Sequence, residues 1–398
     1  MFKLNKIKYI IILSAFVLIL SSCSITEALN DFTNVNNIIE VKNSNDSDSR
    51  LEEIIESKEE NSETSSDNSL SESQTENIIA STYGYELLNN YSEEYKELYG
   101  YKKLQEDVNY GSLLTDVYET FYESSKELLI NDVDYEIYND GDYSYFMIDA
   151  YEYTNSKLLS VITSGWMTMI EENPILYYLF TGYTVKTKNN KYYFCLLGSS
   201  DYAKYEDRLY YNEIILNGIY EFENEYEKLE DNSDYNKALF LHDYICNKIE
   251  YLYDSEGNAS QEAYAHNILG VFGLYNGVCE CYAKVYLFLS YRIDLNSLIV
   301  IGYSGNESNG HAWNVTELDG IWYGVDLTWD DDKKISYDYF LVSYRIMNQA
   351  HSVNSITFGI NFQVPLPELS YNSYDISKDS SIPTPGSTGR GGYILIRW

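Results

Sequence analysis

Apolar residues recur at helix spacing and at strand spacing between residues 82 and 225. The stretch "SLLTDVYETFYESSKELLI" (112–130) has the helix spacing, with apolar positions at Leu113, Leu114, Val117, Phe121 and Leu128. "SKLLSVITSGWMTMIEENP" predicts a second helix that ends before Pro174, because proline disfavours helical backbone in the preceding residue. "TGYTVKTKNNKYYFCLLG" alternates like two strands around a "KNNK" turn. The pattern predicts a mixed α/β accessory domain over 82–225, in which we find no catalytic constellation.

A second unit is predicted over 226–365. It opens with "NKALFLHDYICNKIEYLYD", in which Ala238, Leu241, Ile245 and Ile249 form one helical stripe. Further on, "CECYAKVYLFLSYRI" is apolar nearly all round, as a buried helix is. The "NG" before it is a natural break, so Cys279 is expected in the first turn of this helix.

The segment "GHAWNVTELDGIWYGVDLTWDD" predicts a β-hairpin. Asp319-Gly320 between two runs of β-forming residues favours a two-residue type I′ turn. That turn pairs Leu318 with Ile321, and continued pairing sets Trp313 opposite Asp326 and His311 opposite Thr328. His311 and Asp326 then project from one face as diagonal neighbours, with Cβ atoms roughly 7 Å apart. A slip of one residue would put them on opposite faces.

The N-terminus predicts export and anchoring. Three lysines in "MFKLNKIK" precede a twelve-residue apolar run from Tyr9 to Leu20, shorter than the roughly 20 residues of a spanning helix. The run ends in "LSSC", which resembles a bacterial lipobox. We therefore expect a lipoprotein signal peptide (1–22), lipid attachment at Cys23 and a location on the extracytoplasmic face of the cell membrane; an uncleaved anchor helix is the alternative.

Two further segments are predicted to lack a core. Residues 23–81 are rich in Ser, Glu, Asn and Asp, and predict a disordered acidic tether. The Pro/Gly-rich end of the chain predicts a flexible tail over 366–398, and its abrupt composition suggests a truncated linker or a shifted reading frame. The formal charge of −35 makes nucleic acid an unlikely partner.

The cysteines leave several kinds of chemistry open. Cys279 and Cys281 are poorly spaced for a zinc clip or a redox pair. At a helix N-terminus the backbone N–H groups favour an anion, and the thiolate is the nucleophilic form of cysteine. Cys281 lies about 200° further round the helix and faces elsewhere. A small buried apolar residue remains the alternative for Cys279, and Cys195, Cys246, Cys279 and Cys281 permit three disulfide pairings.

Three blocks, "NGVCECYA", "GHAWNV" and "DGIWYGVDLTWDD", resemble in order and spacing the catalytic blocks of the bacterial transglutaminase-like superfamily. The resemblance covers roughly residues 235–350. It implies an α+β fold like that of papain-like cysteine peptidases, in which a helix bearing the cysteine packs on an antiparallel sheet. It also implies Cys279 as nucleophile, His311 as base and Asp326 as the residue that orients the base. Cys281 stands where the family often has Gly, and Leu327 where it often has Pro.

We therefore expect a lipid-anchored thiol enzyme that hydrolyses or transfers acyl groups of peptide or protein amides, with the cell envelope as a candidate source of substrate. It should need no cofactor or metal and act as a monomer. The Cys279 N–H is the expected first oxyanion donor, with Gln261 and Tyr264 as candidates for the second. The alternatives are a non-catalytic module that binds surface peptide or glycan, and a purely structural lipoprotein.

The remaining histidines and the acidic run favour structural roles. His242, His266 and His351 are scattered along the chain, without the paired spacing of a zinc site. The acidic run Asp330, Asp331 and Asp332 is expected to be a solvated turn, with a Ca²⁺ site as the alternative.

Overall fold

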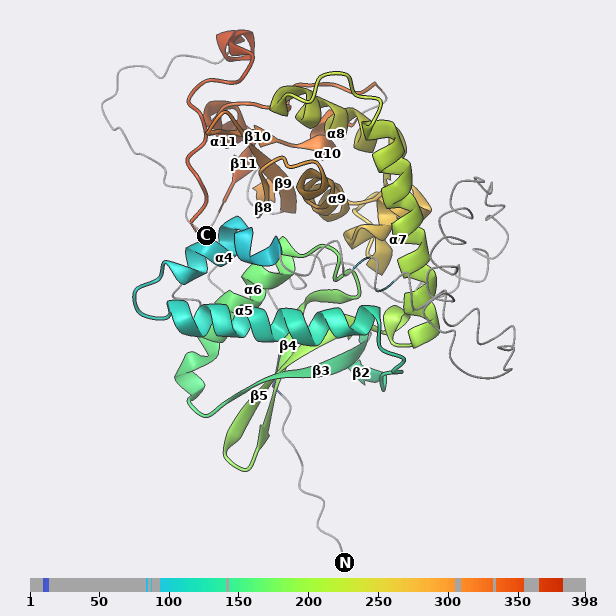
Figure 1. Cartoon of the computed structure of the whole chain (residues 1–398), viewed down its shortest axis with the longest axis vertical. Helices are drawn as coiled ribbons and strands as arrows, with labels where there is room; N and C mark the ends of the chain where they lie inside the picture. Colours follow the sequence, from blue (N-terminus) through green and yellow to red (C-terminus); the bar gives the residue numbers. More distant parts are fainter. Residues whose placement is uncertain are drawn as a thin grey trace, which may run out of the picture.

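The computed structural model describes residues 10–13, 84, 87, 94–140, 143–304, 309–331, 334–353 and 365–381. Cys23, the predicted tether and most of the predicted signal peptide lie outside these residues. Within the described residues, no helix combines the length and apolar character needed to cross a membrane. Figure 1 shows two halves stacked along the long axis, with the helix α7 beside both.

The first half is a five-stranded antiparallel sheet with helices on one face. Its strands are β1 (Ile10–Leu13), β2 (Tyr138–Asp140), β3 (Tyr143–Tyr153), β4 (Leu179–Lys188) and β5 (Lys191–Ser199), in the order β1-β4-β5-β3-β2. Its helices are α4 (Tyr99–Gln105), α5 (Gly111–Lys126) and α6 (Leu159–Glu172). Since β1 lies at the edge and within the predicted signal peptide, removal of that peptide would leave β4-β5-β3-β2 intact.

The apolar pattern of the first half produces the predicted elements. Leu114, Val117 and Phe121 of α5 are buried, and Phe121 packs 5.1 Å from Phe194 of β5, measured between ring centroids. The β4–β5 turn has left-handed backbone at Asn189 and Asn190 (φ 52° and 61°), as a type I′ turn requires. The mixed α/β prediction for this region is confirmed.

The second half contains a four-stranded antiparallel sheet in the order β10-β9-β8-β11. Its strands are β8 (Ser297–Ser304), β9 (Asn309–Leu318), β10 (Ile321–Val325) and β11 (His351–Ser352), and the short strands β6 (Glu250–Tyr251) and β7 (Asn276–Gly277) pair separately. Its helices are α8 (Asp234–Lys248), α9 (Cys279–Arg292), α10 (Leu327–Asp330) and α11 (Tyr344–Ala350). Helix α9 packs on the sheet through Ala283 and Leu287, which contact Ile299 of β8 and Ala312 of β9.

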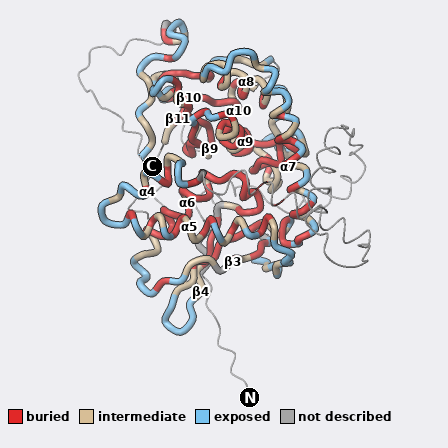
Figure 2. Tube along the Cα trace, viewed as in Figure 1, coloured by how far each residue is buried: buried red, intermediate tan, exposed pale blue. Residues whose placement is uncertain are grey.

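The two halves share one hydrophobic core. A continuous cluster of buried side chains runs from Leu87 to Leu341, and Figure 2 shows buried segments in both halves and where they meet. Helix α7 (Tyr205–Tyr226) provides much of this junction. A Cβ atom on Gly218 of α7 would lie 2.2 Å from the Phe272 ring, so the helix can approach the second half only because this residue is glycine.

Part of the predicted flexible tail is packed, which corrects the boundary at residue 365. Ser370 donates its N–H to the Trp322 carbonyl of β10 at 2.7 Å. Asp379 is buried and accepts hydrogen bonds from Ser343 and from Ser373. Residues 365–381 therefore cover the outer edge of the second half, because their polar groups satisfy buried groups there.

Candidate active site

Cys279 is the first residue of α9, as predicted. Val278, just before it, is extended and donates its N–H to the Ala265 carbonyl at 2.9 Å, which fixes where the helix begins. The thiol side chain is half-buried, in a helix whose other faces are almost wholly buried. N–H groups of a first helical turn have no partner within the helix, so they favour negative charge beside Cys279.

The β9–β10 hairpin has the predicted register. Leu318 is opposite Ile321, and the pairing continues to Asn314 opposite Val325. Asp319 and Gly320 have φ of 54° and 78°, as the type I′ turn requires. The predicted pairing of His311 with Thr328 is wrong, because the chain leaves the sheet at Asp326 and enters α10. Asp326 caps this helix by accepting the Trp329 N–H at 3.3 Å.

The end of the hairpin nevertheless brings His311 and Asp326 together. His311 Nε2 lies 2.7 Å from Asp326 Oδ2, and both side chains are buried. His311 also hydrogen-bonds Cys279. Because Nε2 faces the carboxylate, the ring nitrogen that remains for the thiol is Nδ1. The three side chains that the sequence singled out thus form one chain of contacts.

Electrostatics in this chain favour a charged imidazole. Burial acts to lower the pKa of His311, but the charge of Asp326 and hydrogen bonds to Asp326 and Cys279 outweigh it and raise this pKa to about 10. Burial acts to raise the pKa of Asp326, yet its ion pairs with His311 and His351 hold it well below its usual range. Asp326 is therefore ionised beside a protonated His311 near neutral pH.

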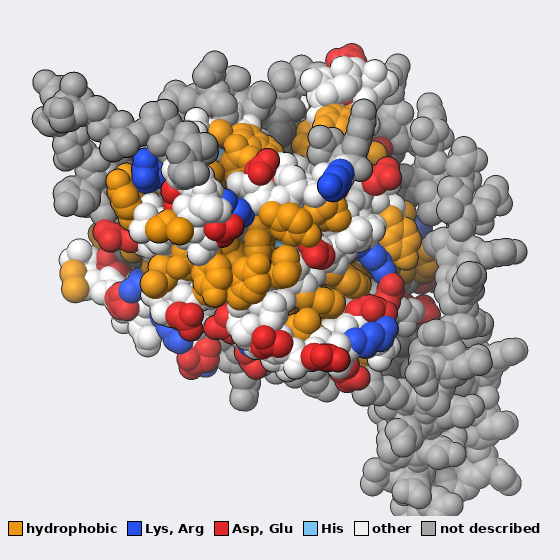
Figure 3. Space-filling view, turned by 90° about the horizontal axis from the view of Figure 1, so that it is seen from above, with side chains coloured by type: hydrophobic (Ala, Val, Ile, Leu, Met, Phe, Trp, Pro, Cys, Tyr) orange, Lys and Arg blue, Asp and Glu red, His pale blue; other side chains and the backbone are white. Residues whose placement is uncertain are grey.

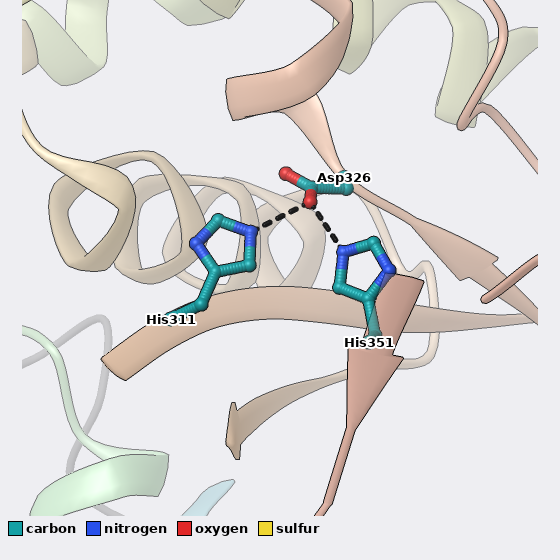
Figure 4. A group of neighbouring side chains, drawn as sticks. All are labelled: His311, Asp326 and His351. Carbon is teal, nitrogen blue, oxygen red and sulfur yellow. Dashed lines mark hydrogen bonds and ion pairs between the residues drawn. The ribbon is translucent and has the colours of Figure 1, made fainter. Parts of the chain in front are cut away.

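His351 is the residue that the sequence did not place in the site. Its Nε2 lies 2.7 Å from Asp326 Oδ2, the same oxygen that binds His311. Figure 4 shows the two imidazoles side by side below the carboxylate. No periodicity or spacing pointed to this contact, because His351 follows Asp326 by 25 residues and belongs to a different strand.

Aromatic rings enclose the histidines. The ring centroid of Trp329 lies 5.6 Å from that of His311 and 4.4 Å from that of His351. The corresponding distances from Trp313 are 5.8 and 4.8 Å. Such rings keep water from Asp326, which strengthens its electrostatic interaction with the histidines.

The other two histidines are also paired with carboxylates. His242 Nε2 lies 3.3 Å from Asp330 Oδ2 in the core, and His266 Nδ1 lies 3.0 Å from Glu280 Oε2. Burial acts to raise the pKa of Glu280, but Lys284 and His266 lower it to about 2. The residue next to Cys279 is thus an anion held between Lys284 and His266.

The acidic run is not the solvated turn that was predicted. Asp330 is fully buried and accepts hydrogen bonds from the Ser336 hydroxyl (2.7 Å) and the Tyr339 N–H (3.0 Å). Asp331 accepts a hydrogen bond from the Tyr282 hydroxyl. Asp332 lies outside the described residues. Asp330 therefore holds the loop after α10 in place.

Among the described residues, His311, Asp326 and His351 have ligand atoms close enough for a metal ion, within 4.8 Å of one another. These atoms already bind each other at hydrogen-bond distance. The rings of Trp313 and Trp329 leave the set enclosed, whereas a catalytic metal keeps an open position. We therefore assign no metal to these three residues.

The surroundings of the Cys279 N–H differ from the prediction. The Tyr251 side chain contacts the Cys279 backbone through a hydrogen bond, and Tyr251 is paired with Gly277 just before α9. The expected candidate Gln261 instead donates to the Ala259 carbonyl at 3.2 Å, within its own turn. Tyr264 is half-buried against the hydrophobic core. Tyr251 therefore places a phenol at the first oxyanion donor.

Cys281 faces away from the thiol of Cys279, as its position on the helix predicted. It is fully buried, and a Cβ atom on Gly270 or Gly277 would lie 2.6 or 2.7 Å from its sulfur. Burial raises the pKa of the Cys281 thiol well above its usual range, against the opposing charge of Lys284. No disulfide joins any two of the described cysteines Cys195, Cys246, Cys279 and Cys281, so none of the three possible pairings is formed.

Comparison with known proteins supports the resemblance. Residues 224–327 match the model of the transglutaminase-like superfamily, a segment that includes Cys279, His311 and Asp326. The second half of the chain has the transglutaminase-like, papain-like fold, with the cysteine helix packed on an antiparallel sheet. No curated protein matches the chain significantly.

Two solved structures are similar to parts of the chain. One is described as a TGase; it is 17% identical, with a TM-score of 0.26, and the match covers 37% of this chain and 44% of that one. The other, from Cytophaga hutchinsonii, is provisionally described as a cysteine protease; it is 16% identical, with a TM-score of 0.23, and the match covers 50% of this chain and 68% of that one. The chain thus spans less than half of the first structure.

Proposed function

We propose that this protein is a thiol enzyme that transfers or hydrolyses acyl groups of peptide or protein amides, with Cys279, His311 and Asp326 as its catalytic residues. The observation that carries the proposal is the contact chain from a helix-terminal cysteine through a buried histidine to a buried aspartate. A structural role alone does not call for a half-exposed thiol at the end of such a chain. The arrangement is that of nucleophile, base and orienting group.

The reaction proceeds through a thioester. The Cys279 thiolate attacks the amide carbonyl, and the tetrahedral oxyanion accepts a hydrogen bond from the Cys279 N–H. The C–N bond then breaks as the His311 imidazolium gives its proton to the leaving amine. In the second half, neutral His311 takes a proton from water or from an amine acceptor, which attacks the thioester and releases the acid or the new amide with the thiol. General acid–base assistance of this kind contributes about 10²- to 10⁴-fold in rate.

The proposal includes an extracytoplasmic location with a lipid on Cys23. Its support is the lysine-rich start, the short apolar run and "LSSC". The acidic segment 23–81 would then separate the folded part from the membrane surface. Growth with labelled palmitate should label the protein in the membrane fraction, and a Cys23→Ser variant should remain unlabelled; label that survives this change would contradict the anchor.

The catalytic proposal is tested with a glutamine-containing donor peptide and a fluorescent primary amine. Uptake of the amine means transamidation, and cleavage or deamidation without uptake means hydrolysis. Cys279→Ala should abolish either activity, whereas Cys281→Ala, two residues away and facing the core, should retain it. If Cys279→Ala acts as well as the natural protein, the thioester mechanism is wrong. Donor binding with an unreactive Cys279 would instead indicate the binding module.

A further inference from the structure

One carboxylate oxygen of the site serves two histidines. Asp326 Oδ2 accepts from His311 Nε2 and from His351 Nε2, each at 2.7 Å. Figure 4 shows that the rings approach from two different strands, β9 and β11. The proposed thioester mechanism employs only His311, and His351 lies beyond residue 327, where the family match ends. The second imidazole therefore needs its own explanation.

His351 is held by contacts that do not involve Asp326. Its Nδ1 lies 3.2 Å from the Met347 carbonyl oxygen in the last turn of α11. Its backbone pairs with Ser304 of β8. Met347 in turn packs so closely on β10 that a Cβ atom on Gly324 would lie 2.4 Å from its side chain. These contacts fix the imidazole next to the strand that ends at Asp326.

The aromatic rings leave this imidazole little freedom. Trp329, Trp313 and Tyr339 lie 4.4, 4.8 and 5.6 Å from His351, measured between ring centroids. The His351 side chain is only 2% exposed and that of Asp326 is 0% exposed. Water therefore cannot replace a hydrogen bond that Asp326 loses, and a buried carboxylate without its donors is strongly destabilised.

The two oxygens of the Asp326 carboxylate are held by different groups. Oδ1 is held by the Trp329 N–H at 3.3 Å, which is a long hydrogen bond, and Oδ2 is held by the two imidazoles. If His351 were absent, His311 alone would hold Oδ2, and His311 must itself shift protons during the reaction. A second donor that takes no part in the proton transfers holds Oδ2 in place while His311 gains and loses its proton.

We propose that His351 is a positioning residue, which donates Nε2–H to Asp326 Oδ2 and so keeps this oxygen directed at His311 throughout the reaction. It acts through Asp326 alone and is not a catalytic residue. This inference rests on the proposed function and adds a fourth member to its contact chain.

Four other titratable groups bear on the charge of this site, and three of them stay neutral. Tyr251 of β6 and Cys279 of α9 lie at the open end, and Cys246 of α8 and Tyr339 interact electrostatically with Asp326. Burial raises the pKa of Tyr251, of Cys246 and of Tyr339. Tyr251, Cys246 and Tyr339 therefore add no charge to the site near neutral pH.

The test compares His351→Phe, which keeps a ring but has no donor, with His351→Gln, whose side-chain amide can donate to Asp326. Ser352→Ala is the control, since Ser352 follows in the same strand and its buried hydroxyl finds no hydrogen-bond partner among the described residues. Two properties are measured: kcat and KM for the amide substrate, and the rate of Cys279 alkylation by iodoacetamide from pH 5 to 9. Alkylation needs no substrate, so it reports on the site even if the acyl donor is unknown.

His351→Phe should lower kcat about 10- to 100-fold, the range seen when outer hydrogen-bond partners of metal-bound ligands are removed, while KM changes less than about 2-fold. Its alkylation rate at pH 6 should fall by about 10-fold, because a loosened Asp326 stabilises the thiolate–imidazolium pair less well. His351→Gln should restore most of both losses, and Ser352→Ala should show neither.

An unchanged alkylation profile in folded His351→Phe would overturn the inference, as would equal losses in the Phe and Gln variants. Should His351→Phe fail to fold, His351→Asn replaces it, because its shorter amide cannot reach Asp326; a Gln variant no better than Asn would then overturn the inference. Failure of the proposed function gives a different result. In that case Cys279→Ala would keep the acyl-transfer activity, with either His351 or a substituted residue at position 351.

Discussion

Asp326 makes three side-chain hydrogen bonds although no part of it reaches solvent. Its Oδ2 binds His311 and His351, and its Oδ1 accepts the Trp329 N–H that begins α10. One side chain therefore ends a strand, caps a helix and orients the proposed base. The two carboxylate oxygens allow both roles, because Oδ1 caps the helix while Oδ2 faces the histidines.

Replacing Asp326 should show how its charge supports the base. The pKa of His311 is about 10 because the Asp326 charge outweighs burial, so the activity of the natural protein should decline only as the pH approaches 10. Asp326→Asn keeps an oxygen but removes the charge, so His311 loses its proton at a lower pH. We expect kcat/KM to fall about 10²-fold and its alkaline limb to move toward neutrality in a pH–rate profile.

The matched control is Asp331→Asn, which removes a nearby acidic residue that accepts a hydrogen bond from Tyr282. Its alkaline limb should stay where it is in the natural protein. If the two variants have the same profile, the charge of Asp326 does not set the basicity of His311.

At the scale of elements, the sequence predicted the features that depend on neighbouring residues. The register of β9 and β10 follows from Asp319-Gly320, and the start of α9 follows from the break before Cys279. The contact of His351 with Asp326 depends instead on β11 pairing with β8 and on α11 packing on β10. Such contacts join segments far apart in the chain, and the periodicity of apolar residues cannot predict them.

Two predictions were wrong, one for a local reason and one for a distant contact. His311 does not pair with Thr328, because a helix cap competes with strand pairing after Val325 and Asp326 can form the cap at once. Asp330 was predicted to be solvated from its acidic neighbours, but His242 of α8 and the loop at Ser336 enclose it. The cap joins Asp326 to Trp329 three residues on, whereas Asp330 binds His242, which is 88 residues away in the chain.

The turn that sets the hairpin register can be tested through its glycine. Gly320 has φ of 78°, and a Cβ atom added there would meet nothing within 4 Å, so its effect is confined to the backbone. Gly320→Val should lower the free energy of unfolding by about 1–2 kcal/mol, because side chains disfavour left-handed backbone. Urea unfolding measures this loss. Asp319→Asn, which tolerates such backbone, should change the free energy by less than about 0.5 kcal/mol, and equal stability of the two variants would contradict the assigned turn.

At the scale of the whole molecule, the halves behave as one folded unit in the structure. Their core is continuous, and Gly218 of α7 is in close contact with Phe272 of the second half. The chain carries a formal charge of −35, and Figure 3 shows acidic side chains along the rim of one face, around an apolar area. A compact chain with so much negative charge is destabilised by its own repulsion, which grows as carboxyl groups ionise.

Buried carboxyl groups should therefore give the protein its highest stability on the acidic side of neutrality. Burial raises the pKa of Glu172 to about 7, against hydrogen bonds from the N–H groups of Gly100 and Tyr101. Since this pKa lies above the unfolded value, the stabilisation is present below pH 4.5 and is lost as the pH rises through 7. Glu280 has a pKa of about 2, so its contribution is present above pH 4.5 and is lost toward pH 2.

The two trends together place the maximum of the free energy of unfolding near pH 5. Urea unfolding at pH 5, 6, 7 and 8 should show a decline, to which Glu172 contributes on the order of 3 kcal/mol. Glu172→Gln cannot ionise, so its decline should be shallower, even if the lost acceptor lowers its stability at pH 5. Exposed Glu227 provides the control: Glu227→Gln should keep the slope of the natural protein. A stability that rises from pH 5 to pH 8 would mean that Glu172 is ionised in the folded protein, and that the junction between α4 and α6 holds a charge rather than a proton.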